Sequence, residues 1–258
     1  MHIQKLFDLT GKVIVVTGGS GQYGKCLVEG LAEAGGTVIT TSRNLKSATD
    51  TAAEFQQKGL DVRPMELDQG IPESVYRFSK TLEDNYGALH VFVNNAVSRP
   101  MKGYNGPLEQ FAESMRVNAT GMWNLLKVMT DKIIASGGGS VISISSMMGM
   151  KGPDLSNYEG TNMGDLPPDY FFHNAGLINL SRFLAKMHAG KNIRFNCISP
   201  GGLFNEQPKA FLDNYCKKVP LGRMANKDDI KGLAVLLASD AGAYINGENI
   251  LMDGGLNA

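Results

Sequence analysis

The stretch Thr17-Gly18-Gly19-Ser20-Gly21-Gln22-Tyr23-Gly24 decides the fold of this 258-residue chain. An apolar run from Val13 to Val16 precedes it and predicts a buried strand, and an amphipathic segment follows it. Glycines let the backbone approach a ligand closely, and a helix N-terminus favours anions. A strand, a glycine loop and a helix in this order therefore predict a pyrophosphate site and a bound dinucleotide.

The residues after the loop support a strand-helix-strand unit. Leu27, Val28 and Leu31 recur on one face of a 3.6-residue period, and a helix is expected there. Gly35 and Gly36 end it, and the segment 37–41 predicts a second strand. A glycine loop alone also suits an ordinary strand-to-helix turn, so its flanking elements carry the interpretation.

The alternation of expected strands and helices continues to the end of the chain. Further strands are expected at 62–66, 91–93, 140–144, 193–198 and 249–252. Helices are expected from Pro72, from near Pro107 to Ser136, from Asn174 to Ala189, and after a cap at Asp228 or Asp229. Strands that alternate with helices predict an α/β fold: one doubly wound Rossmann domain over residues 1–258, with about seven parallel strands and helices on both faces. Functional residues should follow the carboxyl ends of the strands.

Composition narrows the class of protein. The 25 basic and 25 acidic residues leave no net charge to attract nucleic acid or an acidic membrane, and 43% hydrophobic residues suffice for a core. No apolar run is long enough to span a bilayer, and the first residues lack the apolar core of a secretion signal, so a cytoplasmic protein is expected. Cys26, Cys197 and Cys216 are widely spaced, which predicts buried reduced thiols and neither a disulfide framework nor a metal site.

At the predicted strand ends the sequence resembles the short-chain dehydrogenase/reductase family over nearly its whole length. The motifs that carry the resemblance are the 17–24 loop, Asp68, Asn94-Asn95-Ala96, Asn118, Ser145-Ser146 and Pro200-Gly201. Asn and Asp are ordinary turn residues when taken singly. The order and spacing of the motifs together make the resemblance specific.

The resemblance implies a set of cofactor contacts around these strand ends. Gln22 stands where many relatives have glycine, so Gly18, Gly21 and Gly24 form the working glycine set, and Asp68 is expected to bind the adenine amine. The predicted cofactor-binding residues are Gly18, Ser20, Gly21, Gln22, Tyr23, Gly24, Ser42, Arg43, Asn44, Leu67, Asp68, Asn95, Ala96, Val97, Tyr170, Asn174, Pro200, Gly201 and Leu203.

The end of the second strand favours NADP over NAD. An NAD enzyme usually offers an acid to the ribose hydroxyls, but here the residues are Ser42, Arg43 and Asn44. No carboxylate repels a 2′-phosphate, and a guanidinium binds phosphate as a fork. A solvated surface arginine is the alternative interpretation.

In the family, a serine orients the substrate carbonyl, a tyrosine exchanges the proton, and a lysine four residues later holds the ribose and acidifies the tyrosine. Ser146 matches the serine. Tyr170 matches the tyrosine better than Tyr158, which lies among glycines and a proline pair, and Asn174 then occupies the lysine position. Asn118 resembles the family's helix asparagine, whose water-binding role loses its usual partner without the lysine.

The asparagine at position 174 weakens the predicted chemistry without excluding it. A nearby opposite charge lowers the pKa of an acid by about 1–3 units, which corresponds to about ten- to a thousand-fold in rate. Asparagine donates hydrogen bonds but carries no charge. His173, Lys102 and Lys151 are candidate substitute cations, although each is also typical of a surface residue.

The leading hypothesis is an NADP(H)-dependent reductase or dehydrogenase acting on a carbonyl or secondary alcohol of a sugar-like small molecule. The segment around Tyr158, Asn95-Ala-Val-Ser-Arg-Pro100 and Ser199-Pro-Gly-Gly-Leu-Phe-Asn205 resemble a subgroup of bacterial surface-sugar and flagellin-modification oxidoreductases. Residues 202–219 are expected to form a substrate lid, with Phe204, Phe211 and Tyr215 as pocket walls or packing contacts. The family resemblance also implies a homotetramer.

Two other interpretations of Asn174 stay open. In the first, the chain is a catalytically impaired NADP-binding sensor or scaffold. In the second, the asparagine was introduced to trap a complex.

Overall fold

The computed structural model describes all 258 residues and contains one seven-stranded sheet in the order β3-β2-β1-β4-β5-β6-β7. Every neighbouring pair of strands is parallel. The strands are β1 (Val13–Thr17), β2 (Thr37–Ser42), β3 (Val62–Glu66), β4 (Val91–Asn94), β5 (Gly139–Ile144), β6 (Ile193–Pro200) and β7 (Asn249–Met252). The predicted doubly wound α/β fold is confirmed.

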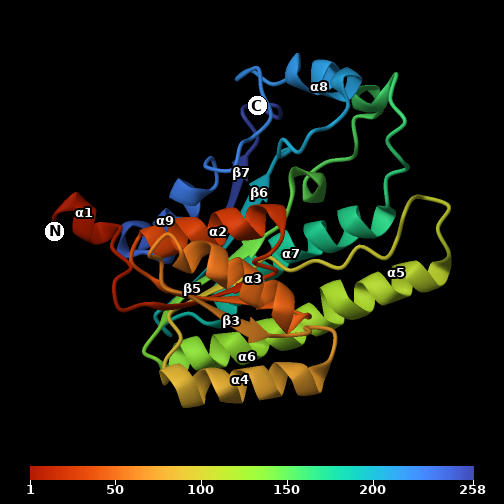
Figure 1. The fold of residues 1–258 in the computed structure, drawn as a ribbon. Helices are drawn as coiled ribbons and strands as arrows, with labels where there is room; N and C mark the ends of the chain where they lie inside the picture. Colours follow the sequence, from red (N-terminus) through yellow and green to blue (C-terminus); the bar gives the residue numbers. More distant parts are fainter.

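Helices connect the strands and cover the sheet (Figure 1). They are α1 (Ile3–Leu6), α2 (Gln22–Glu33), α3 (Leu45–Gln56), α4 (Pro72–Tyr86), α5 (Leu108–Met115), α6 (Met122–Ala135), α7 (Pro168–Met187), α8 (Lys209–Cys216) and α9 (Lys231–Ala238). A π-helix, η1 (Arg116–Gly121), joins α5 to α6, and short 3-10 turns occur at η2 (Met147–Gly149), η3 (Leu155–Tyr158) and η4 (Asp240–Gly242).

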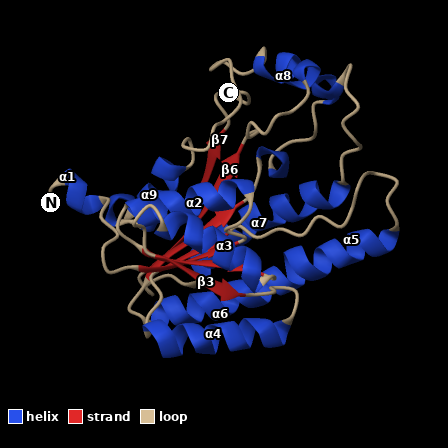
Figure 2. Ribbon diagram, viewed as in Figure 1, coloured by secondary structure: helices blue, strands red, loops and turns tan.

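The sheet has a hydrophobic core on each face, and Figure 2 shows the strands between the helical layers. Ile14 and Val16 of β1 pack with α2, α3 and α9, whereas Val15 between them packs with α4, α6 and α7. This alternation follows from the two-residue period of a strand. Each fully buried aliphatic side chain stabilises the fold by about 1.5–3 kcal/mol. Because these side chains point to both faces of the sheet, the same strands hold the helices on both sides.

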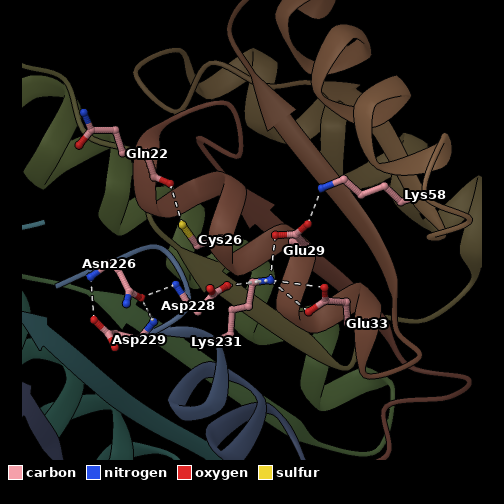
Figure 3. Close-up of polar contacts among 9 residues, drawn as sticks. All are labelled: Gln22, Cys26, Glu29, Glu33, Lys58, Asn226, Asp228, Asp229 and Lys231. Atoms are coloured by element: carbon pink, nitrogen blue, oxygen red, sulfur yellow. Dashed lines mark hydrogen bonds and ion pairs between the residues drawn. The ribbon is translucent and has the colours of Figure 1, made fainter. Parts of the chain in front are cut away.

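An ion cluster fastens α2 to α9 (Figure 3). Lys231 Nζ lies 2.8 Å from Glu29 and 3.2 Å from Glu33 of α2, and 3.3 Å from Asp228. Burial opposes the charge of Lys231, but its hydrogen bonds to these carboxylates prevail and raise its pKa. The helices approach closely, because a side chain at Gly30 would stand 2.9 Å from the Lys231 Cβ. The helix that carries the glycine loop is thereby held in place.

The structure confirms the boundaries of the long helix, reveals a π-helix inside it, and corrects the start of α7 and the N-cap of α9. The long helix spans residues 108–135 but contains the π-helix, whose wider turn places Asn118 away from a regular α-helical position. α7 begins at Pro168, six residues before Asn174, so Tyr170 lies in its first turn. The predicted Asp228 or Asp229 cap of α9 is wrong, since the N-cap is Ile230 and Asp229 instead binds Arg223.

The structure also bears on two expectations from composition, which concern membrane spans and cysteines. None of the helices combines the length and apolar character that a membrane crossing needs. All three cysteines are free, and Cys26 and Cys197 are buried as expected, but Cys216 is only partly buried.

Candidate functional site

A cavity of about 670 Å³ opens beyond the carboxyl ends of β1, β2, β4, β5 and β6. The glycine loop and the end of β2 line one part of it, and α7 with the segment after β6 lines another. Ligands of doubly wound folds bind at this edge of the sheet. Of the predicted site residues, the cavity is lined by Gly18, Ser20, Gly21, Gln22, Tyr23, Gly24, Ser42, Arg43, Leu67, Asn95, Ala96, Val97, Asn118, Ser146, Tyr170, Asn174, Pro200, Gly201 and Leu203.

The glycine loop has close backbone packing that only glycine permits. Gly18 has a positive φ of 64°, and a side chain on Gly24 would collide with the Gly18 carbonyl. Gly19, outside the predicted working set, faces away from the cavity and packs against Thr40. Gly21 caps α2 with no side-chain hydrogen bond, so the first backbone N–H groups of this helix remain available to an anion.

Asn95 stabilises the glycine loop through hydrogen bonds. Its side-chain amide donates to the carbonyls of Thr17 at 2.9 Å and Gly18 at 3.2 Å, while the Thr17 hydroxyl accepts from the backbone of Asn95 and Ala96. The predicted cofactor-binding residues Asn95 and Ala96, which follow β4, are therefore held by hydrogen bonds to Thr17 and Gly18 of the glycine loop.

Two predicted cofactor residues, Asn44 and Asp68, do not line the cavity. Asn44 caps α3 by accepting from the Lys46 backbone at 2.9 Å, and Asp68 accepts from the Gly70 backbone at 2.8 Å. Both side chains make the local turn contacts that Asn and Asp favour. Gln69, which the sequence analysis did not single out, lines the cavity instead and has a buried Oε1 with no partner.

Ser146, Tyr170 and Asn174 reach the same cavity from β5 and α7. Asn174 is buried, its side-chain amide donates to the Tyr170 carbonyl at 2.7 Å, and its own carbonyl accepts from the Ser145 hydroxyl at 3.0 Å. The Ser146 hydroxyl accepts from the Met148 backbone at 3.1 Å and caps the η2 turn. These contacts fix the turn after β5 against the helix that carries Tyr170.

Tyr158, the rival tyrosine, also lines the cavity. It ends the η3 turn, and its ring packs edge-on against Phe211 of α8 at 5.3 Å between centroids. Burial raises the pKa of its phenol. Tyr158 therefore belongs to an aromatic wall, whereas Tyr170 shares its helix with Asn174.

The cations around Tyr170 differ from those the sequence suggested. Lys102 and Lys151 do not line the cavity. His173 does line it, and burial lowers its pKa to about 4, so its imidazole is neutral at pH 7. The charged neighbour is Arg99, whose guanidinium lies 5.0 Å from the centre of the Tyr170 ring. Arg99 lies within the family-like motif Asn95-Ala-Val-Ser-Arg-Pro100, but its contact with Tyr170 spans 71 residues of sequence, and no local pattern reveals it.

Asn118 has a structural contact that the sequence did not predict. From the π-helix its side chain accepts from the Ser98 backbone N–H at 2.8 Å and donates to the Ser98 carbonyl at 2.7 Å. This two-point clamp fixes the chain immediately before Arg99.

Residues of the segment 202–219, for which a lid is expected, line the cavity at Gly202, Leu203, Gln207, Phe211 and Tyr215. Phe211 and Tyr215 of α8 line it and also pack with Met147 and Met224 in a small apolar cluster, so they serve as both wall and packing. The Tyr215 hydroxyl accepts from the Gly202 backbone at 2.8 Å. Phe204 is 51% exposed and does not line the cavity.

Known proteins share this architecture. A family model described as enoyl-(acyl carrier protein) reductase matches residues 23–257. The 3-oxoacyl-acyl-carrier-protein reductase of Chlamydia trachomatis is 30% identical over 255 residues, covering 96% of this chain and 98% of that protein. The 2-dehydro-3-deoxy-D-gluconate 5-dehydrogenase of Pseudoalteromonas atlantica is 29% identical over 258 residues, covering 96% of this chain and 97% of that protein.

A solved structure is also similar to this chain over nearly its whole length. A gluconate 5-dehydrogenase from Burkholderia cenocepacia, in complex with NADP and tartrate, has a TM-score of 0.89 and 27% identity, covering 99% of this chain and 98% of its own. With the fold, the cavity and these matches together, the chain belongs to the short-chain dehydrogenase/reductase family, whose members are oxidoreductases acting on carbonyl or alcohol groups.

Proposed function

We propose that this protein is an NADP(H)-dependent oxidoreductase that interconverts a carbonyl group and a secondary alcohol in a sugar or sugar-like molecule. The observation that carries the proposal is a single cavity, lined by the glycine loop and Arg43 and also by Ser146, Tyr170 and Asn174. The start of α2 and the Arg43 guanidinium suit a phosphate, and the hydroxyls of Ser146 and Tyr170 suit a carbonyl oxygen, so one cavity offers groups for both cofactor and substrate.

The residues present fit a dinucleotide. The free N–H groups at the start of α2 suit a pyrophosphate, and the cavity volume of about 670 Å³ lies in the range of ligand sites. Arg43 is exposed at the end of β2 and makes no ion pair, so its donors are available to a 2′-phosphate. The nicotinamide of a bound cofactor supplies or accepts the hydride.

The chain's own groups handle the proton and the position of the substrate. In the reducing direction the Tyr170 phenol donates its proton to the carbonyl oxygen, and the Ser146 hydroxyl donates a hydrogen bond to the same oxygen. Asn174 uses one amide hydrogen on the Tyr170 carbonyl and keeps its oxygen and second hydrogen for the ribose hydroxyls. The missing charge of a lysine is expected to slow the reaction.

The cofactor preference is the first test. We expect NADPH to bind about ten- to a hundred-fold more tightly than NADH, because a hydrogen bond to a charged group contributes about 1.5–3 kcal/mol. Arg43→Met should remove most of this difference and leave the NADH dissociation constant nearly unchanged. Fluorescence titration of both nucleotides measures it, and equal constants in the unmodified protein would sink the NADP assignment.

The names of relatives support a sugar-like substrate. One curated relative is named as a dehydrogenase of 2-dehydro-3-deoxy-D-gluconate, and one similar structure is titled a gluconate 5-dehydrogenase. The resemblance to surface-sugar and flagellin-modification enzymes points in the same direction. We further propose that residues 1–258 form one domain, that residues 202–219 act as its lid, and that the protein is a homotetramer.

A second candidate function is an NADP-binding sensor or scaffold with little turnover. It is favoured by Asn174, whose amide is engaged on its own helix and brings no charge to Tyr170. Turnover of the unmodified protein beside that of Asn174→Lys separates the two candidates, since turnover in the unmodified protein supports the oxidoreductase and turnover in the lysine form alone supports the sensor or scaffold.

A further inference from the structure

The cavity carries positive charge and no negative charge. Its lining includes no aspartate, glutamate or lysine, and Arg43 and Arg99 are its only permanently charged residues. The two arginines follow different strands, Arg43 after β2 and Arg99 after β4. With Arg43 assigned to the cofactor, Arg99 is left as a charge without a ligand.

Arg99 is aimed at the reacting end of the cavity. Its guanidinium carbon lies over the Tyr170 ring, 5.0 Å from the ring centre. The guanidinium makes no side-chain hydrogen bond within the protein, so its N–H donors are free for the two oxygens of a planar anion. An anion bound there would lie beside the phenol proposed to transfer the proton.

No group of the protein neutralises Arg99. It makes no ion pair with any carboxylate, and the buried carboxyl of Asp169 on α7 does not line the cavity. His173, which contacts the Tyr170 ring at 5.5 Å between centroids, has a buried Nε2 with no hydrogen-bond partner. A buried polar atom without a partner is costly, so a ligand polar group at this place would satisfy it.

The side chain of Arg99 is exposed, but the main chain that carries it is held by hydrogen bonds. Asn118 clamps both backbone polar groups of Ser98, and the Lys102 ammonium donates to the Arg99 carbonyl at 3.2 Å. These contacts hold the main chain from which the guanidinium extends. Preorganised donors lose less conformational entropy when a ligand binds.

We propose that the substrate carries a carboxylate or phosphate group close to its reacting carbonyl, and that Arg99 binds this group beside Tyr170. The inference rests on the proposed reductase function and names the substrate class of the same cavity. Because Arg99 is exposed, water solvates its guanidinium when no anion is bound, and a neutral sugar or a long apolar chain would gain no charge-assisted hydrogen bond from it.

Binding to the NADPH-loaded protein tests the inference without turnover, because both partners are then in reduced form. The probes are tartrate against neutral threitol, and glycerol 3-phosphate against neutral glycerol, all measured by calorimetry. At least one anion should bind about tenfold or more tightly than its neutral counterpart, as expected for a charge-assisted hydrogen bond. Tartrate alone binding identifies a carboxylate site, and glycerol 3-phosphate alone a phosphate site.

Arg99→Met should abolish the difference between anion and neutral probe, and Arg99→Lys should restore only part of it, because lysine lacks the planar fork. Arg77→Met is the matched control, since Arg77 is exposed on α4, makes no ion pair and does not line the cavity. It should keep the preference.

Several outcomes would overturn the inference. They are equal affinity for each pair, no binding of either anion, an anion preference that survives Arg99→Met, and a loss of NADPH affinity in that variant, which would assign Arg99 to the cofactor. Absence of NADPH binding to the unmodified protein would instead contradict the proposed function, so the two failures are distinguishable.

Discussion

At the scale of single residues, Asn174 decides how much chemistry the site supports. Its side chain folds back onto the Tyr170 carbonyl, and the backbone around it packs tightly, since a side chain at Gly149 would stand 2.8 Å from the Asn174 carbonyl carbon. Asn174 lines the cavity, and a lysine at this position would bring a positive charge into it. We therefore expect residue 174 to affect the use of a cofactor more than its binding.

We expect Asn174→Lys to raise the rate of carbonyl reduction by about ten- to a thousand-fold, because a cation near the phenol lowers its pKa by about 1–3 units. Steady-state absorbance of NADPH, with a panel of oxo sugar acids and ketose phosphates, gives kcat and KM. Tyr170→Phe in the same lysine background is the control and should lose the gain. A lysine variant no faster than the parent, with NADPH bound, would show that the chain does not need this charge.

At the scale of elements, Lys218 joins the proposed lid, residues 202–219, to the segment between η2 and α7. Its ammonium lies 2.7 Å from Asp154 and also donates to Ser156 and to Asn157 at 2.7 Å. The hydrogen bonds from Lys218 and Ser156 lower the pKa of Asp154 to about 2. The Asn214 amide donates a further hydrogen bond to the Glu159 carbonyl at 3.0 Å, so the two segments are joined and together form the proposed cover of the cavity.

Lys218→Met should loosen this cover, since it removes the shared partner of three side chains. Hydrogen exchange in residues 154–159 should become faster, and KM should rise more than kcat falls. Lys217→Met is the neighbouring control, because Lys217 is exposed and contacts only Asn214. Unchanged exchange in the Lys218 variant would contradict this role of Lys218.

The same ion pair predicts a pH effect with a defined sign. The pKa of the Asp154 carboxyl is lower in the folded protein than in the unfolded chain, so its ionised form stabilises the fold above about pH 4. This stabilisation is lost as the pH falls from about 4 toward 2. The protection of residues 154–159 should therefore decline over this window in the parent and not in Lys218→Met.

At the scale of the whole molecule, exposed apolar side chains on α6 and α7 favour the proposed homotetramer. Phe172, Phe183 and Met187 lie on one stripe of α7 and are 65%, 51% and 64% exposed, and Trp123 of α6 is 41% exposed. Large apolar side chains gathered on one face mark interaction surfaces.

Phe183→Asp should shift the protein toward dimers or monomers in sedimentation velocity, because an interface core excludes an unpaired charge. Ile3→Asp is the control, since Ile3 is 59% exposed on the short α1 helix, away from this stripe. A parent protein that sediments as a monomer would refute the assembly.

The sequence by itself determined the strands, their helical connections and the glycine loop, because apolar periodicity and glycine conformation are local properties of the chain. Tertiary structure decided which polar residues act together. Asn44 and Asp68 were drawn into local turns, the predicted aspartate cap of α9 gave way to an ion pair with Arg223, and a loop arginine met Tyr170. The turn contacts of Asn44 and Asp68 and the Arg223–Asp229 pair are local, and they show that the sequence offered these side chains more than one partner. The contact between Arg99 and Tyr170 joins residues 71 positions apart, and packing brings them together without leaving a periodic trace in the sequence.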